Sequence, residues 1–236
     1  MSDKSGIWIT GASSGIGKAA AKEFAAVGCN VFVSARRISE LDRLKDELGE
    51  LGERVFIYPC NVASSTNVEQ TVKKISSEFK IDCLVNNAGI TSFKFAEDNS
   101  TNEINDIIGT NLMGSIYTIK SVLPHFIENN NGTIINILSV VVKKVFTKSS
   151  AYAASKMGLL GYSDSLREEV RKHNIRVINV IPGATETSMW SQDVRKQYSE
   201  RMLQPESIAR TIVSAYLQKD KLVTEEILIR PQEGDL

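Results

Sequence analysis

Short apolar runs alternate with longer amphipathic segments along almost the whole chain. The short runs are rich in Val and Ile and have the length of strands, which are predicted at residues 6–10, 31–35, 55–59, 83–86, 133–138, 176–181 and 226–229. The longer segments predict helices at 15–27, 38–51, 68–79, 151–173 and 205–217, and a long helical stretch that ends near Asn129. This alternation of strand and helix is the order of an α/β protein.

Three details of the pattern predict the architecture. Between residues 38 and 51, leucines recur at steps of 3, 4 and 3, so they share one face of a helix. The strands are continuously apolar, which indicates a parallel sheet that is buried on both faces. No repeat or linker interrupts the pattern. We therefore predict one domain over residues 1–236, with a doubly wound, Rossmann-type parallel sheet and helices on both faces.

Such sheets bind ligands at the carboxyl ends of their strands. Residues 183–204 lack a clear periodicity, and they include polar residues, Met and Trp. A long segment of this kind is often functional. We predict that residues 183–204 form a mobile lid over the carboxyl edge of the sheet.

Composition and charge narrow the classes of protein that fit. The chain has 236 residues, of which 42% are hydrophobic and 24% charged, enough to bury a full core. Its 28 Lys and Arg balance 28 Asp and Glu, which does not fit a strongly basic nucleic-acid-binding protein. No apolar run approaches the roughly 18 residues of a membrane helix, and the apolar patch at residues 7–9 does not resemble a signal peptide.

Cysteine and histidine usage favours a reducing compartment without a metal site. Cys29, Cys60 and Cys83 lie far apart beside apolar runs, where a free thiol behaves as a small hydrophobic side chain. Neither His125 nor His173 lies in a metal-ligand pattern. Free thiols persist in the cytosol, so we expect a cytoplasmic protein that holds no metal.

A glycine-rich loop joins the first predicted strand to the first predicted helix. Residues 10–17 read TGASSGIG. Gly11 allows a tight turn, Gly15 lets the backbone approach a phosphate, and Gly17 lets the helix pack on the strand. The helix N-terminus adds amide groups and a positive dipole for the anion. The loop therefore predicts a dinucleotide site, and a triphosphate-binding loop is disfavoured because no Gly-Lys-Ser/Thr follows.

Further motifs follow in a fixed order. They are NNAG at 86–89, Asn111, Ser139, YAASK at 152–156, Pro182-Gly183 and Thr187. In order and spacing the chain resembles the short-chain dehydrogenase/reductase family over nearly its whole length, in particular members similar to 3-oxoacyl-(acyl-carrier-protein) reductases. The resemblance implies hydride transfer between a nicotinamide cofactor and a carbonyl/alcohol pair.

Tyr152 and Lys156 are spaced i, i+4 and would share one face of a helix. Alone, this pattern more often marks a packed aromatic and a solvated lysine. Beside the other motifs, we expect the Lys156 ammonium to lower the pKa of the Tyr152 phenol, which would make Tyr152 an acid/base near neutrality. The resemblance implies that Ser139 binds the substrate carbonyl oxygen, that Asn111 helps hold a water-linked proton path to Lys156, and that Lys156 also binds the nicotinamide ribose.

The end of the second predicted strand distinguishes NAD(H) from NADP(H). A carboxylate at this place would bind the ribose diol and repel a 2′-phosphate. The chain has Ala35 there, followed by Arg36 and Arg37, whose planar cations suit a phosphate. We predict NADP(H); the alternative is a pair of solvated arginines. After the third strand, Asn61-Val62 replaces the Asp-Val that often holds adenine in the family, and an amide can still donate and accept there.

The resemblance implies further contacts with the cofactor and the substrate. Together with the two arginines, the cofactor contacts are expected at Gly11, Ser13, Ser14, Gly15, Ile16, Gly17, Asn61, Val62, Asn87, Ala88, Gly89, Tyr152, Lys156, Pro182, Gly183, Thr185 and Thr187. Substrate contacts are expected at Ser139, Val141, Tyr152, Met189 and Trp190. The apolar residues among these fit a small ketone or aldehyde, or else they belong to the core.

Several alternatives stay open. A 3-oxoacyl-(acyl-carrier-protein) reductase would present basic side chains to its acidic carrier; the turn at 128–131 has none, while Arg171 and Lys172 are available. Sepiapterin-type, sugar and hydroxy-acid dehydrogenases have the same four catalytic residues. A protein that binds NADPH without turnover would tolerate the loss of Tyr152 or Lys156, and neither is lost. A Rossmann methyltransferase would normally have an acidic residue after the second strand.

The resemblance also implies a homodimer or homotetramer. In the family, the long helices that carry the positions of Asn111 and Tyr152 pack against a partner's copies, which gives a symmetric interface. Neither a nucleic acid nor a membrane is expected as a partner.

Overall fold

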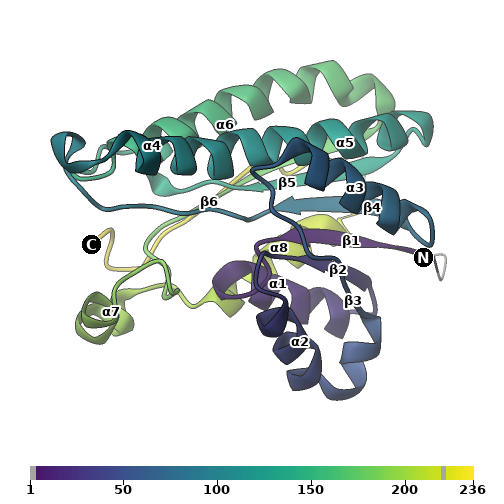
Figure 1. Cartoon of the computed structure of the whole chain (residues 1–236), viewed down its shortest axis with the longest axis horizontal. Coiled ribbons are helices and arrows are strands. Elements are labelled where there is room, and N and C mark those ends of the chain that lie inside the picture. The colour runs from purple at the N-terminus through teal and green to yellow at the C-terminus, as the bar shows by residue number, and fades with distance from the viewer. Residues whose placement is uncertain (1–3, 219–221) are drawn as a thin grey trace.

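The computed structural model, which describes residues 4–218 and 222–236, is built around one parallel β-sheet (Figure 1). Its seven strands lie in the order β3-β2-β1-β4-β5-β6-β7, and every neighbouring pair is parallel. The strands are β1 (Ser5–Thr10), β2 (Asn30–Ser34), β3 (Val55–Ile57), β4 (Lys80–Asn86), β5 (Gly132–Ile137), β6 (Ile175–Pro182) and β7 (Glu226–Ile229). The strand order reverses between β1 and β4, so the predicted doubly wound sheet is confirmed.

Helices cover both faces of this sheet (Figure 1). One face carries α1 (Gly15–Ala26), α2 (Ile38–Glu47) and α8 (Pro205–Leu217). The other carries α3 (Ser65–Ser76), α4 (Thr101–Ile108), α5 (Gly114–Glu128) and α6 (Ser150–Val170). The short helix α7 (Gln192–Tyr198) lies beyond the carboxyl ends of the strands, at the lower left of Figure 1. Within the described ranges, no helix is long and apolar enough to cross a membrane.

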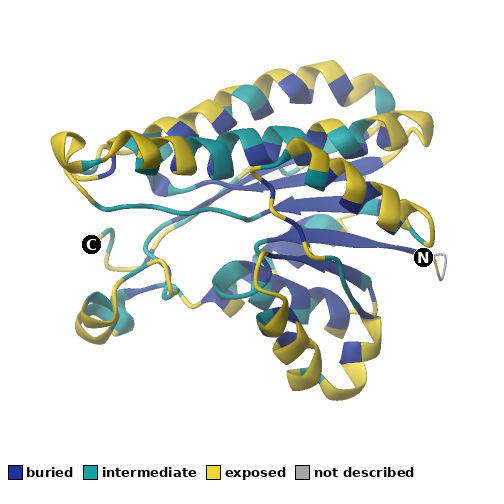
Figure 2. Cartoon of the chain, viewed as in Figure 1, coloured by how far each residue is buried: buried dark blue, intermediate teal, exposed yellow. Residues whose placement is uncertain are grey.

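The core consists of two apolar layers separated by the sheet. Phe24, Leu41 and Ile212 belong to the layer under α1, α2 and α8. Trp8 and Phe126 belong to the layer under α3, α5 and α6. Figure 2 shows the central strands buried along nearly their full length between these layers, whereas the edge strands β3 and β7 are partly exposed. Each buried large side chain contributes about 1.5–3 kcal/mol, so the layers supply the main driving force for folding.

Most predicted segments are shifted only slightly at their ends, and three differ more from the observed ones. The predicted helix 38–51 ends at Glu47, because Gly49 has a φ of +53°, and residues 49–54 form a 3₁₀ turn. The stretch that was expected to be helical up to Asn129 is divided by a π-helical segment, Gly109–Met113. The lid segment, which has no visible periodicity, contains α7; seven residues are too few for an amphipathic pattern to appear.

Three buried asparagines lie side by side on β4, β5 and β6. Asn86 pairs with Asn136, and Asn136 with Asn179, in the strand register. Asn86 Nδ2 donates to Asn136 Oδ1 over 3.0 Å, and Asn136 Nδ2 donates to Ser163 Oγ on α6 over 2.9 Å, with Asn179 Oδ1 3.5 Å away. On the other side, Thr118 Oγ1 of α5 donates to Asn86 Oδ1 over 2.6 Å. The buried amides therefore link three strands to the two helices above them.

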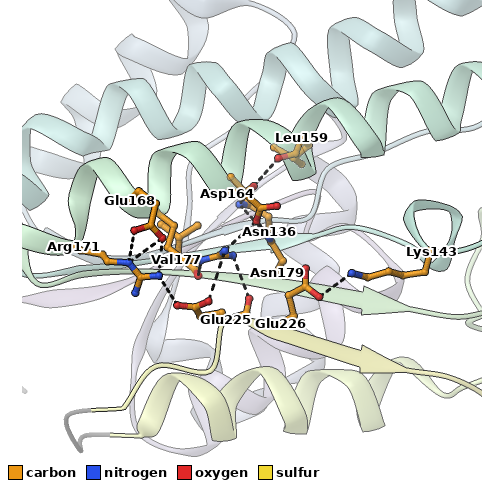
Figure 3. A network of polar contacts seen from close by, with 12 residues as sticks. Asn136, Lys143, Leu159, Asp164, Glu168, Arg171, Val177, Asn179, Glu225 and Glu226 are labelled. Carbon is orange, nitrogen blue, oxygen red and sulfur yellow. Dashed lines mark hydrogen bonds and ion pairs between the residues drawn. The ribbon is translucent and has the colours of Figure 1, made fainter.

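This polar chain continues to the surface at the end of α6 (Figure 3). Asn179 Nδ2 donates to Asp164 Oδ1 over 3.3 Å, and Asp164 binds Arg167 Nη1 over 3.0 Å. Arg167, whose side chain is 9% exposed, also donates to the backbone carbonyl of Glu225 over 3.4 Å. Arg171 reaches the Glu225 carboxylate over 2.7 Å. The chain of contacts thus fastens the segment before β7 to α6.

We expect Asn136→Ala to destabilise the protein by at least about 2 kcal/mol, because it leaves the buried Asn86 amide without its acceptor and Ser163 without its donor. The free energy of unfolding from urea titration measures this effect. The matched control is Asn131→Ala, at an exposed position just before β5, where a change within about 0.5 kcal/mol is expected. Equal losses in the two variants would contradict the role of the buried amides.

Candidate active site

The loops that leave the carboxyl ends of β1, β4, β5 and β6 meet at one edge of the sheet, the left edge in Figure 1. The glycine loop follows β1, and the 86–89 motif follows β4. Ser139 follows β5, and Gly183 follows β6. The structure therefore brings together motifs that are spread over more than 170 residues of sequence.

The glycine loop is shaped by close contacts that leave no space for side chains. Gly15 has a φ of +55°, and a Cβ there would lie 2.9 Å from Thr187 Cγ2. At Gly17 a Cβ would lie 2.3 Å from Asn87 Nδ2. Both positions therefore require glycine. The contact of Gly15 with Thr187 also places the start of the lid segment directly on the loop.

Asn87 fastens the loop to the end of β4. Its Nδ2 donates to the carbonyls of Thr10 and Gly11, each over 3.0 Å, and Thr10 Oγ1 accepts from the backbone amides of Asn87 and Ala88 over 3.1 and 3.2 Å. Both N–H groups of the Asn87 amide are thus used within the protein. The Asn87 side chain therefore holds the glycine loop in shape. The sequence had suggested only a contact with the cofactor at this residue.

A hollow of ≈ 340 Å³ opens beside the glycine loop, between α1 and the lid segment. Beside Gly15 and Thr187, its lining holds three cations and two carboxylates, which are Lys18, Lys22, Arg195, Glu186 and Glu206. Arg195 Nε is buried and has no hydrogen-bond partner among the described residues. Buried donors are normally paired, so this one indicates a missing acceptor. A phosphate beside the amides at the start of α1 would supply such an acceptor, while Lys18 and Lys22 are already paired with Glu47.

Arg195 was missed in the sequence analysis. The only available signal was a basic residue inside a segment already predicted to cover the site.

The end of β2 is also cationic. Ala35 is 9% exposed and carries no charge, while Arg36 and Arg37 are exposed. Arg37 Nη2 donates to Ser13 Oγ over 3.2 Å, which places this guanidinium against the glycine loop. Two cations and a hydroxyl therefore lie where a ribose 2′-phosphate is expected.

The remaining predicted cofactor contacts line the same edge. Asn61 Oδ1 accepts from the Ala63 amide over 3.3 Å, and Val62 is buried against Gly114. Gly183 N donates to the carbonyl of Ile229 over 2.7 Å, which joins the start of the lid segment to β7. The others border the glycine loop, the β4 end or the β6 end: Ser14, Ile16, Ala88, Gly89, Pro182, Thr185 and Thr187.

Tyr152 and Lys156 lie on one face of α6, beside Ser139. Both are almost fully buried, with 8% and 4% of their surface exposed. Lys156 Nζ donates to the carbonyl of Ile137 over 2.7 Å and lies 5.8 Å from the centre of the Tyr152 ring. The Ser139 hydroxyl accepts from the amide of Val141 over 3.4 Å. The predicted acid/base, its lysine and the predicted carbonyl-binding hydroxyl are thus assembled.

The π-helical segment holds Asn111 inside the protein. Asn111 is 0% exposed, and its carboxamide binds the backbone of Ile90 in both directions, over 2.8 and 2.9 Å. Its Nδ2 also donates to Ser155 Oγ over 3.0 Å. A Cβ at Gly89 would lie 3.4 Å from Asn111 Oδ1 and 3.6 Å from Lys156 Nζ. Asn111 therefore fixes the loop after β4 relative to α6.

Burial controls the charges at this site, and it corrects one expectation. Burial raises the pKa of Tyr152 to about 12, although its hydrogen bond with Ser139 opposes the rise. Burial also lowers the pKa of Lys156 to about 8. In the protein alone, the net shift of the Tyr152 pKa is thus upward, opposite to the expected lowering, because the loss of water outweighs the attraction of a Lys156 ammonium that faces a backbone carbonyl. At neutral pH, Tyr152 is a neutral proton donor.

Two of the predicted substrate contacts, Met189 and Trp190, lie in the lid segment. Met189 is 37% exposed, and Trp190 is half-buried. Trp190 stacks on Phe93, an aromatic residue of the loop after β4 that the sequence analysis did not single out. No cluster of three or more potential metal ligands occurs in residues 4–218 and 222–236.

Comparisons with known proteins agree with this geometry. Residues 6–198 match the family described as short chain dehydrogenase. Sepiapterin reductase from Chlorobaculum tepidum is 34% identical over 236 residues, which cover 97% of this chain and 96% of that protein. A metagenomic short-chain oxidoreductase solved in complex with NADP is 29% identical, with a TM-score of 0.84 and 97% of each chain covered.

The closed form of a serine dehydrogenase complexed with NADP⁺ is 26% identical, with a TM-score of 0.90, and the match covers 98% of this chain and 96% of that one. A family match over most of the chain and a full-length relative above 30% identity agree on one conclusion. The chain belongs to the short-chain dehydrogenase family and is an oxidoreductase that acts on carbonyl or alcohol groups.

Proposed function

We propose that this chain is an NADP(H)-dependent reductase that converts a ketone or an aldehyde reversibly to an alcohol. The observation that carries the proposal is the joint burial of Tyr152 and Lys156 beside Ser139, at the edge where the glycine loop opens. Burying two ionisable groups costs stability, which a purely structural pair would not require. The solved relatives described above were crystallised with NADP or NADP⁺.

In the reducing direction, bound NADPH supplies the hydride for the carbonyl carbon. Ser139 donates a hydrogen bond to the carbonyl oxygen and polarises it. Tyr152, neutral because burial raises its pKa to about 12, transfers its proton to the same oxygen as negative charge develops there. The Lys156 ammonium, 5.8 Å from the ring, then stabilises the phenolate that remains. Asn111 keeps the neighbouring loop in place through Ile90.

The chain binds NADP(H) through two groups of cations. Arg36 and Arg37 hold the ribose 2′-phosphate, where the hydrogen bond of Arg37 to Ser13 already orients one guanidinium. Arg195 meets the diphosphate in the hollow beside Gly15 and Thr187. Arginine suits both sites because its planar fork matches phosphate oxygens.

We favour a free small molecule as the substrate. The neighbouring relative named sepiapterin reductase makes a sepiapterin-type carbonyl compound one candidate. A carrier-bound 3-oxoacyl group is the weaker alternative, since Arg171 is already paired with Glu168 and Glu225, each over 2.7 Å. A cytoplasmic location, a homodimer or homotetramer, and a mobile lid at residues 183–204 stay predictions.

The first test concerns the acid/base. Tyr152→Phe removes the phenol and keeps the ring, so we expect NADPH binding to stay within tenfold while turnover of any carbonyl substrate falls by at least about 10²-fold, as is typical of a lost general acid. NADPH consumption is followed by absorbance and binding by fluorescence titration. Near-full turnover in this variant would refute the mechanism and favour a protein that binds NADPH without Tyr152 chemistry.

The second test concerns pH. Lys156 has its pKa lowered from 10.5 to about 8, so it is charged below that pH and loses its charge as pH rises through it. Only the charged form stabilises the Tyr152 phenolate. We therefore expect kcat/KM for reduction to decrease as pH rises through about 8, and this decrease to shift upward in Lys156→Arg, whose guanidinium stays charged to above about pH 12. A rate that is constant between pH 7 and 10 would contradict the role of Lys156.

The third test concerns cofactor preference. Charge-assisted hydrogen bonds contribute about 1.5–3 kcal/mol each, so wild type should prefer NADPH over NADH by at least tenfold in kcat/KM. Ala35→Asp with Arg36→Ile should reverse this preference, because a carboxylate binds the ribose diol and repels the phosphate. Arg43→Ile, which removes an exposed arginine of α2 paired with Glu40, is the control and should change nothing. Equal use of both cofactors by wild type would show that the arginines are only solvated.

A further inference from the structure

Two aromatic rings join the lid segment to the loop after β4. The rings of Phe93 and Trp190 are stacked, with centroids 4.6 Å apart and planes inclined by 17°. Phe93 lies four residues after Gly89, which borders Asn111 and Lys156, and Trp190 lies three residues after Thr187, which touches Gly15. The stack therefore joins the loop that begins beside the catalytic residues to the segment that begins on the glycine loop.

Phe93 is held in an unusual backbone conformation. Its φ is +49°, in the left-handed region that bulky residues rarely adopt. The loop is fastened before Phe93 by Ile90 on Asn111 and by Ser92 Oγ, which donates to Asn99 Oδ1 over 2.6 Å. After Phe93, Asn99 Nδ2 donates to the Phe95 carbonyl over 3.0 Å. A strained residue persists when its surroundings fix it, and such residues gather at functional sites. The Phe93 ring is thus presented to Trp190 from a rigid base.

The lid segment, by contrast, is anchored mainly at its neck. There, Leu203 N donates to the Ala184 carbonyl over 2.8 Å, and Glu186 N donates to the Leu203 carbonyl over 2.9 Å. Farther along, its polar contacts with the rest of the described chain include an exposed one between Arg201 and Glu233 over 3.2 Å. Beyond the neck, the aromatic stack adds an apolar contact between the lid segment and the loop after β4.

We propose that Phe93 is a specificity-determining residue, which together with Trp190 forms an aromatic wall that selects flat, conjugated carbonyl substrates. This inference rests on the proposed carbonyl reduction. The two near-parallel rings are only half-buried, so part of their surface stays available to a third planar group. At 4.6 Å between centroids, the space between them is already filled.

The geometry discriminates by shape. A flat ring can approach an aromatic face closely and continue the offset stack, and such stacking stabilises a complex beyond the area that it buries. A saturated ring of equal size holds its carbon atoms farther away, because its axial hydrogens point at the face. The wall therefore favours an aryl ketone over the cyclohexyl ketone with the same carbon skeleton.

The test compares acetophenone with cyclohexyl methyl ketone in wild type, Phe93→Leu and Trp190→Leu. The measured quantity is the ratio of the two kcat/KM values, so the intrinsic reactivity of each ketone cancels between variants. We expect this ratio to fall by about two- to tenfold in both leucine variants, which corresponds to the loss of one aromatic stacking interaction. Phe93→Tyr, which keeps the ring, should retain the wild-type ratio.

Phe95→Leu is the matched control. Phe95 lies in the same loop and is 48% exposed, but its ring is near Lys148 and is not stacked on Trp190. Its ratio should equal that of wild type. An unchanged ratio in both Phe93→Leu and Trp190→Leu would overturn the proposal, and so would an equal fall in Phe95→Leu.

The failure of the proposed function would look different. If no carbonyl compound oxidises NADPH, the reduction itself is refuted, and the wall is tested by binding alone. Calorimetry with saturating NADP⁺ then gives the Kd of each ketone, and the same ratio is compared between the variants. If Phe93→Leu does not fold, Trp190→Leu, in the exposed lid segment, decides the question.

Discussion

The buried amides of Asn86, Asn136 and Asn179 are the constraint on which the rest of the structure depends. Each must keep its hydrogen bonds inside the sheet, because an unpaired buried amide costs about 1–3 kcal/mol. A slip of one residue between β4, β5 and β6 would separate the amides and turn them toward the wrong layer of the core. The register that satisfies them also ends these strands at one edge, and the loops that follow carry the site.

At that edge, segments that are far apart in the sequence are held together by short contacts. Gly15 rests on Thr187, Gly17 on Asn87, and Asn87 on the end of β1. Each contact needs a small residue or an amide at one position, so a single side chain added to the loop would displace a second segment. The glycine loop, the start of the lid segment and the end of β4 therefore depend on one another for their positions. The residues that make these contacts occur in the sequence as separate short motifs.

Burial has opposite effects on the two central ionisable groups of the site. It raises the pKa of Tyr152 to about 12 and lowers that of Lys156 to about 8, since removing water disfavours a phenolate and an ammonium alike. Proximity in sequence had favoured the opposite expectation for Tyr152. Because Lys156 Nζ lies 5.8 Å from the centre of the ring and is bonded to the Ile137 carbonyl, burial has the larger effect on the Tyr152 pKa. Tyr152 is therefore suited to give a proton, and Lys156 to compensate the charge left behind.

The sequence by itself determined the strand–helix order, the parallel sheet and the glycine loop, because these follow from periodicity and from local backbone needs. Through the resemblance of its ordered motifs to a known family, it also indicated Ser139, Tyr152 and Lys156 as a group. The tertiary structure alone decided that Asn111 lies in a π-helical turn bonded to Ile90, that Arg195 enters the hollow at Gly15, and that Phe93 stacks on Trp190. These features depend on which distant segments come into contact and on how much water the contacts exclude. The local pattern of hydrophobic and polar residues specifies neither of these.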